Sequence, residues 1–311
     1  MAQKIAVAGA TGNLGKRIVK ALRQQKAEVT ALVRKDGDET KQRNLEQSGA
    51  KVHPVDLANV EQVGQALIGV HCLVSAVQGL RDVIVDGQTV LLKAALHAKV
   101  PRFIPSDFST DFRKLRPGEN RNFDLRRDFH QMLDKAPIAF TSIFNGAFTD
   151  ILTYNVPFFD AKKKIVGYWD DPDWYVDFTS MDDTAAYTAL AAMDPTTPQA
   201  LCIASFQVSA RKLADFTKNV WGTPFELVRL GSREDLAEKN RRDRAEHPEG
   251  ESELYASWQG GQYLQSMFAA HHESLDNGRY PQIQWITLEK VLRPQSAASS
   301  KPIQDDQPPI A

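Results

Sequence analysis

The chain has 311 residues, a length typical of about two domains, and 42% of them are hydrophobic, enough for a sizeable core. Its 38 basic and 39 acidic side chains give a formal net charge of −1, which argues against a nucleic-acid-binding protein. Two cysteines, Cys72 and Cys202, exclude a disulfide framework and a CxxC-type zinc site, so no metal is predicted and both thiols are expected to be buried. Without an apolar run of ~20 residues or a leader-like start, a cytoplasmic protein with no membrane partner is expected.

The first 150 residues alternate between short apolar runs and segments with helical periodicity. The expected strands are 5–8, 28–33, 51–55, 71–76, 102–105 and 139–144. The expected helices are 16–25, 61–67, 83–98 and 124–135. Strands separated by helices form βαβ units, so we predict a doubly wound parallel α/β sheet with right-handed crossovers.

Beyond residue 150 the alternation ends, and a smaller, mainly helical C-terminal part is expected. We divide the chain into a cofactor-binding domain at 1–154, a substrate domain at 155–293 and a disordered tail at 294–311, with 178–204 packing back on the first domain. The aromatic and acidic stretch 168–176 is expected to be a loop or hairpin. Ser180 is expected to cap helix 184–193, with Asp183 completing a capping box, and 211–221 and 233–246 are also expected to be helical.

A glycine-rich turn, Gly9-Ala10-Thr11-Gly12-Asn13-Leu14-Gly15, separates the first expected strand from the first expected helix. In this spacing Gly9 permits a sharp turn, Gly12 lets a pyrophosphate approach the backbone, and Gly15 lets the helix pack closely on the sheet. The helix N-terminus adds free N–H groups and a partial positive charge. We therefore predict a dinucleotide site; a turn with only a packing role is the alternative. The predicted contacts are Gly9, Thr11, Gly12, Asn13, Leu14 and Gly15.

The residues after the second expected strand bear on which dinucleotide binds. An NAD site usually places Asp or Glu about 20 residues after the glycine turn, where it bonds the ribose 2′-hydroxyl. Here that place holds Arg34 and Lys35, and an arginine can bind a 2′-phosphate with a bidentate fork. We therefore predict NADP(H). Asp36 could still reach a hydroxyl, and the polar segment 35–43 could be a solvated loop.

Two further segments are expected to contact the cofactor. Asp56 directly follows the third expected strand, where it could bond the adenine amino group or cap the next helix. Ser75, Ala76 and Val77 end the fourth strand and are expected to pass under the ribose and pyrophosphate.

Four motifs fall in an order and at distances that resemble a known family. They are residues 9–15, Ser75-Ala76-Val77, Arg102-Phe103-Ile104-Pro105-Ser106-Asp107-Phe108 and Phe144-Asn145-Gly146. Over roughly residues 3–290 they resemble the NmrA-like and isoflavone-reductase-like group of atypical short-chain dehydrogenases. The resemblance implies a Rossmann NADP(H) domain, a smaller C-terminal substrate domain and an active site in the cleft between them. It adds Pro105, Ser106, Asp107 and Phe144 to the expected cofactor contacts.

Catalytic candidates follow from the same resemblance. The family's reductases carry a catalytic lysine three residues after a phenylalanine, and that place here holds Arg126, after Phe123. Arginine can bind a phosphate or polarise a carbonyl, but with a pKa above ~12 it cannot cycle protons. No tyrosine is followed four residues later by lysine, so carbonyl reduction by a Tyr–Lys pair is not expected. His130, one helical turn after Arg126, is a candidate proton donor or a packing residue, and Asn145 is a candidate substrate ligand.

Two functions are compatible with these residues. The leading hypothesis is an NADPH-dependent reductase of a small hydrophobic, aromatic or quinone-like substrate, in which Arg126 and Asn145 position the substrate oxygen. The alternative is a non-catalytic NADP(H) sensor that acts through a protein partner. His271 and His272 are expected to be a helical surface pair without a role in metal binding.

Overall fold

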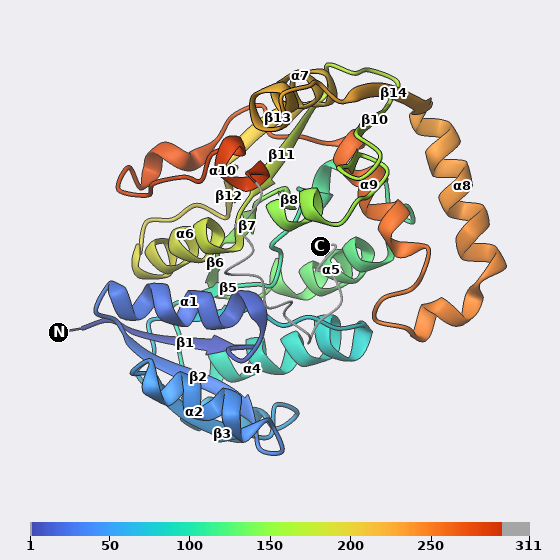
Figure 1. The fold of residues 1–311 in the computed structure, drawn as a ribbon. Coiled ribbons are helices and arrows are strands. Elements are labelled where there is room, and N and C mark those ends of the chain that lie inside the picture. Colours follow the sequence, from blue (N-terminus) through green and yellow to red (C-terminus); the bar gives the residue numbers. More distant parts are fainter. Residues whose placement is uncertain (1, 294–311) are drawn as a thin grey trace.

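A six-stranded parallel sheet forms the N-terminal half of the computed structural model, which describes residues 2–293 (Figure 1). Its strands, in the order β3-β2-β1-β4-β5-β6, are β1 Lys4–Ala8, β2 Glu28–Arg34, β3 Lys51–Val55, β4 Cys72–Ser75, β5 Arg102–Ile104 and β6 Ala139–Phe140. The strand order reverses direction between β1 and β4. In such sheets a ligand crevice lies beyond the carboxyl ends of the strands at this point. The predicted doubly wound parallel α/β fold is confirmed.

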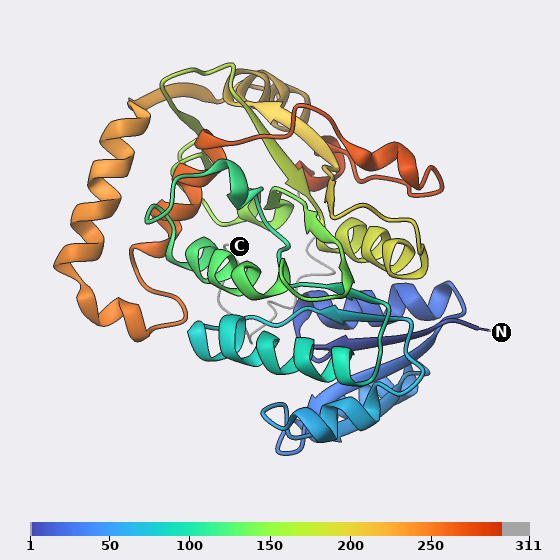
Figure 2. The same cartoon turned by 180° about the vertical axis from the view of Figure 1, so that it is seen from behind.

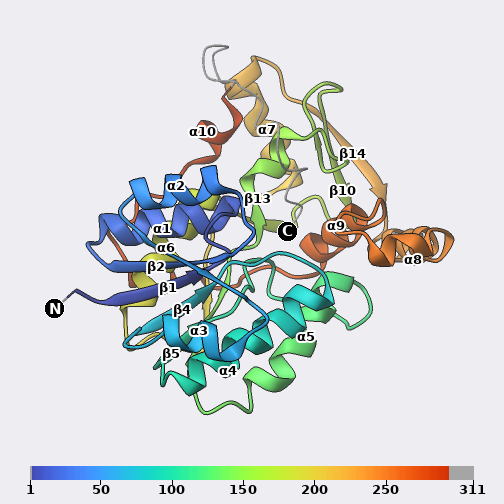
Figure 3. The ribbon, with the colours of Figure 1, turned by 90° about the horizontal axis from the view of Figure 1, so that it is seen from below.

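Helices cover both faces of this sheet (Figures 2 and 3). One face carries α1 Asn13–Gln24, α2 Glu39–Gln47 and α6 Met181–Met193. The other face carries α3 Val60–Ala66, α4 Gln88–His97 and α5 Arg121–Leu133. Each face has a continuous apolar core, with Ile18 and Leu22 of α1 on one side and Leu91 and Phe129 of α4 and α5 on the other. Burial of these side chains stabilises the packing of the helices on both faces of the sheet, and this packing fixes the position of the carboxyl edge.

Several element boundaries differ from the sequence-based ones for local reasons. Helix α1 begins at Asn13 instead of 16, directly after the glycine turn. Helix α5 begins at Arg121 instead of 124, because the Asn120 side chain accepts the N–H groups of Asn122 and Phe123. The expected helix 83–98 is a π-helical segment, Asp82–Gly87, followed by α4. Helix α2 was missed because its polar sequence has no apolar periodicity; the Asp38 side chain caps it.

The expected strand 139–144 is two strands, β6 and β7 Ser142–Phe144, that pair with different partners. The break is at Thr141, whose hydroxyl hydrogen-bonds with Thr197 and Pro198. Strand β12 Ala200–Cys202 pairs with β7, and the N-terminal end of α6 is tied to α1 by an Arg17–Asp182 ion pair of 2.9 Å.

The C-terminal part contains small sheets and four helices. Its strands are β8 Ala147–Phe148, β9 Phe159–Asp160, β10 Ile165–Trp169, β11 Tyr175–Thr179, β13 Phe206–Ser209 and β14 Glu226–Gly231. Its helices are α7 Ala210–Trp221, α8 Arg233–Glu246, α9 Gln259–Ala269 and α10 Leu288–Leu292, with 3₁₀ turns at 112–114, 149–153, 248–252 and 276–279 along the chain. Strands β10 and β11 lie in different sheets, so 168–176 is not a hairpin: it is two strand ends joined by a loop.

The expected cap of α6 is half right. Ser180 Oγ accepts the N–H of Asp183 at 3.0 Å, but the Asp183 carboxylate does not return to Ser180. It bonds Ser205 Oγ and the N–H of Ile286, which come from distant parts of the chain. The capping box was therefore wrong because tertiary partners took the carboxylate. The domain limits stay predictions, and the predicted tail at 294–311 lies outside the described residues.

The two thiols sit in different environments. Cys72 is buried, as expected, whereas Cys202 is only half-buried. Burial raises the pKa of Cys72 to about 12 and that of Cys202 to about 11, so neither is a thiolate near neutral pH. Within residues 2–293 no helix is long and apolar enough to cross a membrane, and no three His, Cys, Asp or Glu side chains are grouped to hold a metal ion.

Candidate functional site

The glycine turn is packed against the end of β4 with no room for side chains. Gly9 has φ +74°, and a Cβ on it would lie 2.4 Å from the carbonyl oxygen of Ala76. A Cβ on Gly15 would lie 2.1 Å from the carbonyl oxygen of Gly9. Both contacts are far inside van der Waals distance, so glycine is required at both positions. The turn thereby holds the start of α1 directly over the carboxyl edge of the sheet.

The N-terminus of α1 fits a diphosphate. Gly12, exposed at the N-cap, provides no side-chain cap, and the first turn contains no acidic residue. Since the first backbone N–H groups of a helix lack partners within it, those following Gly12 can bind phosphate oxygens, helped by the partial positive charge of the helix. Thr11, Asn13 and Leu14 are half-buried beside this position.

The turn after β2 presents two cations. Arg34 and Lys35 are exposed and form no ion pair with any residue in the described range 2–293. Asp36 is exposed beside them, whereas Asp38 caps α2. The arrangement fits a 2′-phosphate on the adenine ribose.

Asp56 lies exposed after β3 and accepts the N–H of Ala58 at 2.9 Å. The cap of α3 is Asn59, so the alternative role of Asp56 as that helix cap is wrong. Its carboxylate remains available at the edge of the sheet.

The ends of β4 and β5 are tied together. Ser106 Oγ donates to the carbonyl of Val77 at 2.7 Å, which fixes the loop after β5 to the segment after β4. Ala76 and Val77 are half-buried and keep some exposed surface, whereas Ser75 and Pro105 are buried. Ser75 has no exposed surface and lies in the interior of the domain.

The buried Asp107 pairs with the half-buried His130. Asp107 has no exposed surface, and its Oδ2 contacts His130 Nε2 and Ser142 Oγ, both at 2.7 Å. His130 Nδ1 lies 3.6 Å from the Asp134 carboxylate, so both ring nitrogens face acids. The expected contact of Asp107 with the cofactor and the expected proton delivery by His130 stay predictions. Burial opposes protonation of His130, but Asp107 and then Asp134 outweigh it and raise its pKa.

Phe144 and Asn145 are likewise without exposed surface. The guanidinium of Arg113 lies 4.6 Å from the centre of the Phe144 ring. The backbone of Asn145 bonds Ser109 through its N–H and Thr179 through its carbonyl. Through these contacts the two residues fix the strand end, and the cofactor contact of Phe144 and the substrate contact of Asn145 stay predictions.

Arg126 is the sequence-predicted catalytic residue with an unusual environment. It is 6% exposed, and its Nε and Nη1 donate to the carbonyls of Ser106 and Asn122, both at 3.0 Å. No acidic side chain between residues 2 and 293 forms an ion pair with it. The N–H of Ser106 donates to Gln88 Oε1 at 2.9 Å, so both backbone polar groups of Ser106 are held. Gln88 was missed; the only signal was a polar residue within an apolar helical segment.

Three other polar residues were also missed, because nothing in the sequence links α5 to α9. Arg121 Nε donates to Asn122 Oδ1 at 3.0 Å, and Asn122 Nδ2 donates to Tyr263 Oη at 3.0 Å. The expected surface pair is wrong as well: α9 ends at Ala269, and His272 is buried with its N–H donated to Asp177. Burial lowers the pKa of His272.

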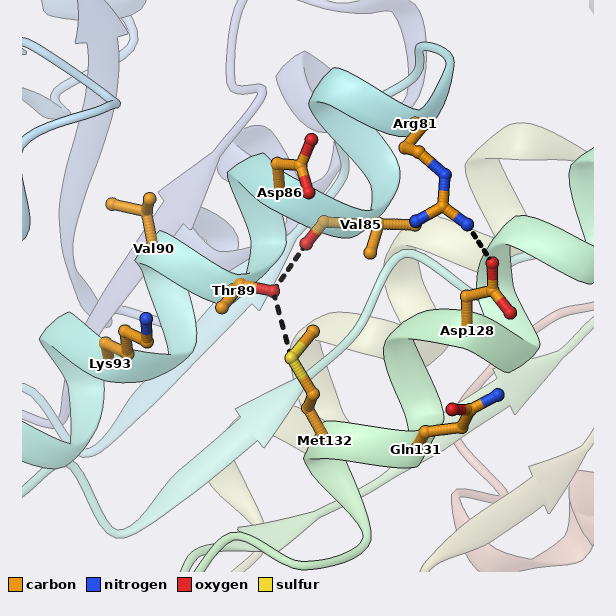
Figure 4. A pocket seen from close by; sticks show the side chains of 9 residues that line it. All are labelled: Arg81, Val85, Asp86, Thr89, Val90, Lys93, Asp128, Gln131 and Met132. Atoms are coloured by element: carbon orange, nitrogen blue, oxygen red, sulfur yellow. Dashed lines mark hydrogen bonds and ion pairs between the residues drawn. The ribbon is translucent and has the colours of Figure 1, made fainter.

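A separate groove of about 610 Å³ lies between the segment 82–97 and α5 (Figure 4). Figure 4 shows an Arg81–Asp128 ion pair across one end and Thr89 bonded to Met132 in the middle. The groove lies on the sheet face opposite α1, so it is distinct from the glycine turn.

Comparisons with known proteins agree with this geometry. The sequence model of the NmrA-like family matches residues 1–240. Pinoresinol reductase 1 of Arabidopsis thaliana is 30% identical over 62% of this chain and 66% of its own length. Bifunctional pinoresinol-lariciresinol reductase 1 of Linum usitatissimum is 26% identical over 93% of this chain and 97% of its own. The solved structure of AtPrR2 with NADP⁺ and (+)pinoresinol superposes with a TM-score of 0.77 at 22% identity, covering 94% of this chain and 98% of that one.

The glycine packing predicts the effect of one methyl group. Gly15→Ala places its Cβ against the Gly9 carbonyl, so we expect a loss of about 1–3 kcal/mol in the free energy of unfolding and a weaker response to added dinucleotide. Gly278→Ala is the control, because a Cβ there has nothing within 4 Å. Chemical denaturation with and without NADPH measures both effects. Equal behaviour of the two variants would contradict the packing described here.

The buried His130–Asp107 pair predicts a pH dependence. Because the pKa of His130 is raised on folding, its contribution to stability is complete below the unfolded pKa of about 6.5 and is lost as pH rises through the folded pKa. His130→Gln should therefore flatten the difference in unfolding free energy between pH 6 and pH 9, whereas exposed His97→Gln should not. An unchanged difference in His130→Gln would show that another group titrates.

Proposed function

The chain belongs to the NmrA-like family, and on this basis we propose that it is an NADPH-dependent reductase of a small hydrophobic, aromatic or quinone-like substrate. The observation that carries the proposal is Arg126, a buried guanidinium without an acidic partner in the described chain. Burying an unpaired cation is costly, so a ligand with negative charge is its natural complement. A substrate oxygen that gains charge during reduction is such a ligand.

The cofactor would be held by groups from three strand ends. The N–H groups after Gly12 would bind the pyrophosphate, Arg34 and Lys35 the 2′-phosphate, and Asp56 the adenine. When bound, NADPH supplies the hydride. The protein then has to place the substrate and stabilise the charge that appears on its oxygen.

Arg126 is suited to the second task. Two of its nitrogens are fixed by backbone carbonyls, which immobilises the guanidinium, while Nη2 has no hydrogen-bond partner within the described residues. A preorganised donor of this kind stabilises a developing oxyanion. The relatives named as reductases of pinoresinol and lariciresinol support a small organic substrate.

The non-catalytic NADP(H) sensor remains the second candidate. It is favoured by one observation, that an arginine stands where the family's reductases have a lysine. A panel of aldehydes, enones and quinones separates the two: NADPH oxidation supports the reductase, and NADPH binding without oxidation of the cofactor by any of them supports the sensor.

Removal of the Arg126 charge should cost activity more than binding. We expect Arg126→Ala to lower kcat by about 10²–10³-fold, the usual effect of losing an oxyanion donor. The Kd for NADPH should change little, since Arg126 is not among the proposed cofactor contacts. Arg126→Lys keeps a positive charge and should retain part of the activity. Equal kcat values for all three proteins would contradict the assignment.

Arg34 should discriminate between the two cofactors. Arg34→Ala is expected to weaken NADPH binding about 10–100-fold, the loss of a charge-assisted bidentate contact, and to leave NADH binding unchanged. Arg43→Ala is the matched control, an exposed cation nine residues along the same surface. Isothermal titration with each cofactor gives the Kd values. A parallel loss for NADPH and NADH would argue against a 2′-phosphate site.

A further inference from the structure

A chain of hydrogen bonds runs from α5 to α9, which lie beside each other (Figure 1). It begins at Arg121, passes through Asn122 and ends at the hydroxyl of Tyr263, with both links at 3.0 Å. All three side chains are buried, at 6%, 8% and 5% exposure. The polar groups are therefore held in a low-dielectric environment in which hydrogen bonds are strong.

The direction of this chain is fixed by chemistry. A guanidinium has only donors, so the oxygen of the Asn122 amide must face Arg121 and its NH₂ group must face Tyr263. The tyrosine oxygen is then an acceptor. Its own proton has no acceptor within residues 2–293 and is left to be donated elsewhere.

The positive charge at the start strengthens the last donor. Each bond polarises the next in the same direction, so the Arg121 charge strengthens the Asn122 N–H donor that the Tyr263 oxygen accepts. Arg121 has no ion pair with an acidic side chain in the described chain: it bonds the Gly250 carbonyl and the Gln259 side chain instead.

Tyr263 of α9 and Arg126 of α5 both bond Asn122, in the first turn of α5. The Asn122 side chain donates to Tyr263, while the Asn122 carbonyl accepts from Arg126 at 3.0 Å. Phe123 lies against both, with its ring centre 5.4 Å from that of Tyr263 and 5.7 Å from the Arg126 guanidinium carbon. A fixed cation and a free hydroxyl proton thus occur together, the two parts that carbonyl reduction requires of a protein.

We propose that Tyr263 is the proton donor of the reaction, an inference that rests on the proposed reductase function. As the substrate's carbonyl carbon receives the hydride, its oxygen takes the Tyr263 proton: the phenol O–H bond breaks, an alcohol O–H bond forms, and water returns a proton to the phenolate. This supplies the step that Arg126 cannot perform, whereas the two ring nitrogens of His130 face Asp107 and Asp134.

The test compares an aldehyde with a quinone. Tyr263→Phe keeps the ring against Phe123 and removes only the hydroxyl, so kcat for aldehyde reduction should fall about 10²–10⁴-fold, the usual contribution of general acid catalysis. Quinone reduction should fall far less, because the hydroquinone anion is a weak base that needs no donor. The Kd for NADPH should stay within about threefold. Asn122→Ala should give a smaller loss with the same substrate order.

The control is Tyr280→Phe, which removes another buried phenol hydroxyl, one bonded to Asp194. It should leave both reactions unchanged. If Tyr263→Phe fails to fold, Tyr263→3,5-difluorotyrosine keeps the hydroxyl and should move the basic limb of the kcat–pH profile for the aldehyde to lower pH. A structural role would leave that limb in place.

The outcomes separate this inference from the proposed function. Wild-type turnover that Tyr263→Phe or the fluorinated variant leaves unchanged overturns the role of Tyr263 and leaves the reductase standing. NADPH binding without turnover of any aldehyde, enone or quinone by the wild type overturns the reductase and this inference together.

Discussion

The site depends on how closely three backbone segments meet at the carboxyl edge of the sheet. The turn after β1 lies against the end of β4 and against its own next helix, at distances that exclude any Cβ on Gly9 or Gly15. This contact places the free N–H groups of α1 over the point where the strand order reverses. Without this contact, one dinucleotide could not bind the cations after β2 and the loops after β4 and β5 at the same time.

A second constraint organises the reacting end of the site. Gln88 accepts the N–H of Ser106 and Arg126 donates to its carbonyl, while the Ser106 hydroxyl donates to the carbonyl of Val77. The guanidinium therefore has a structural role beside the chemical one proposed for it, and a lysine with a single nitrogen would fill both differently. In the proposed reaction, Arg126 fixes the charge in a different way from a lysine, and Tyr263 transfers the proton.

The sequence predicted the sheet and its glycine turn well because both depend on local signals: apolar runs, their spacing and glycines at set intervals. It did not predict how Asp107, His130, Phe144 and Asn145 are packed. Their motif placed them near the site, but their burial depends on partners such as Ser142 and Arg113 that no local pattern identifies. The link from Asn122 to Tyr263 spans 141 residues and could be found only after folding.

A crystal structure of the protein with NADP⁺ and an aromatic aldehyde tests the central claim most directly. The account predicts the pyrophosphate on the backbone N–H groups that follow Gly12, the 2′-phosphate beside Arg34, and the aldehyde oxygen within hydrogen-bond distance of Arg126. A dinucleotide seated away from the glycine turn, or an aldehyde oxygen facing neither Arg126 nor Tyr263, would contradict it.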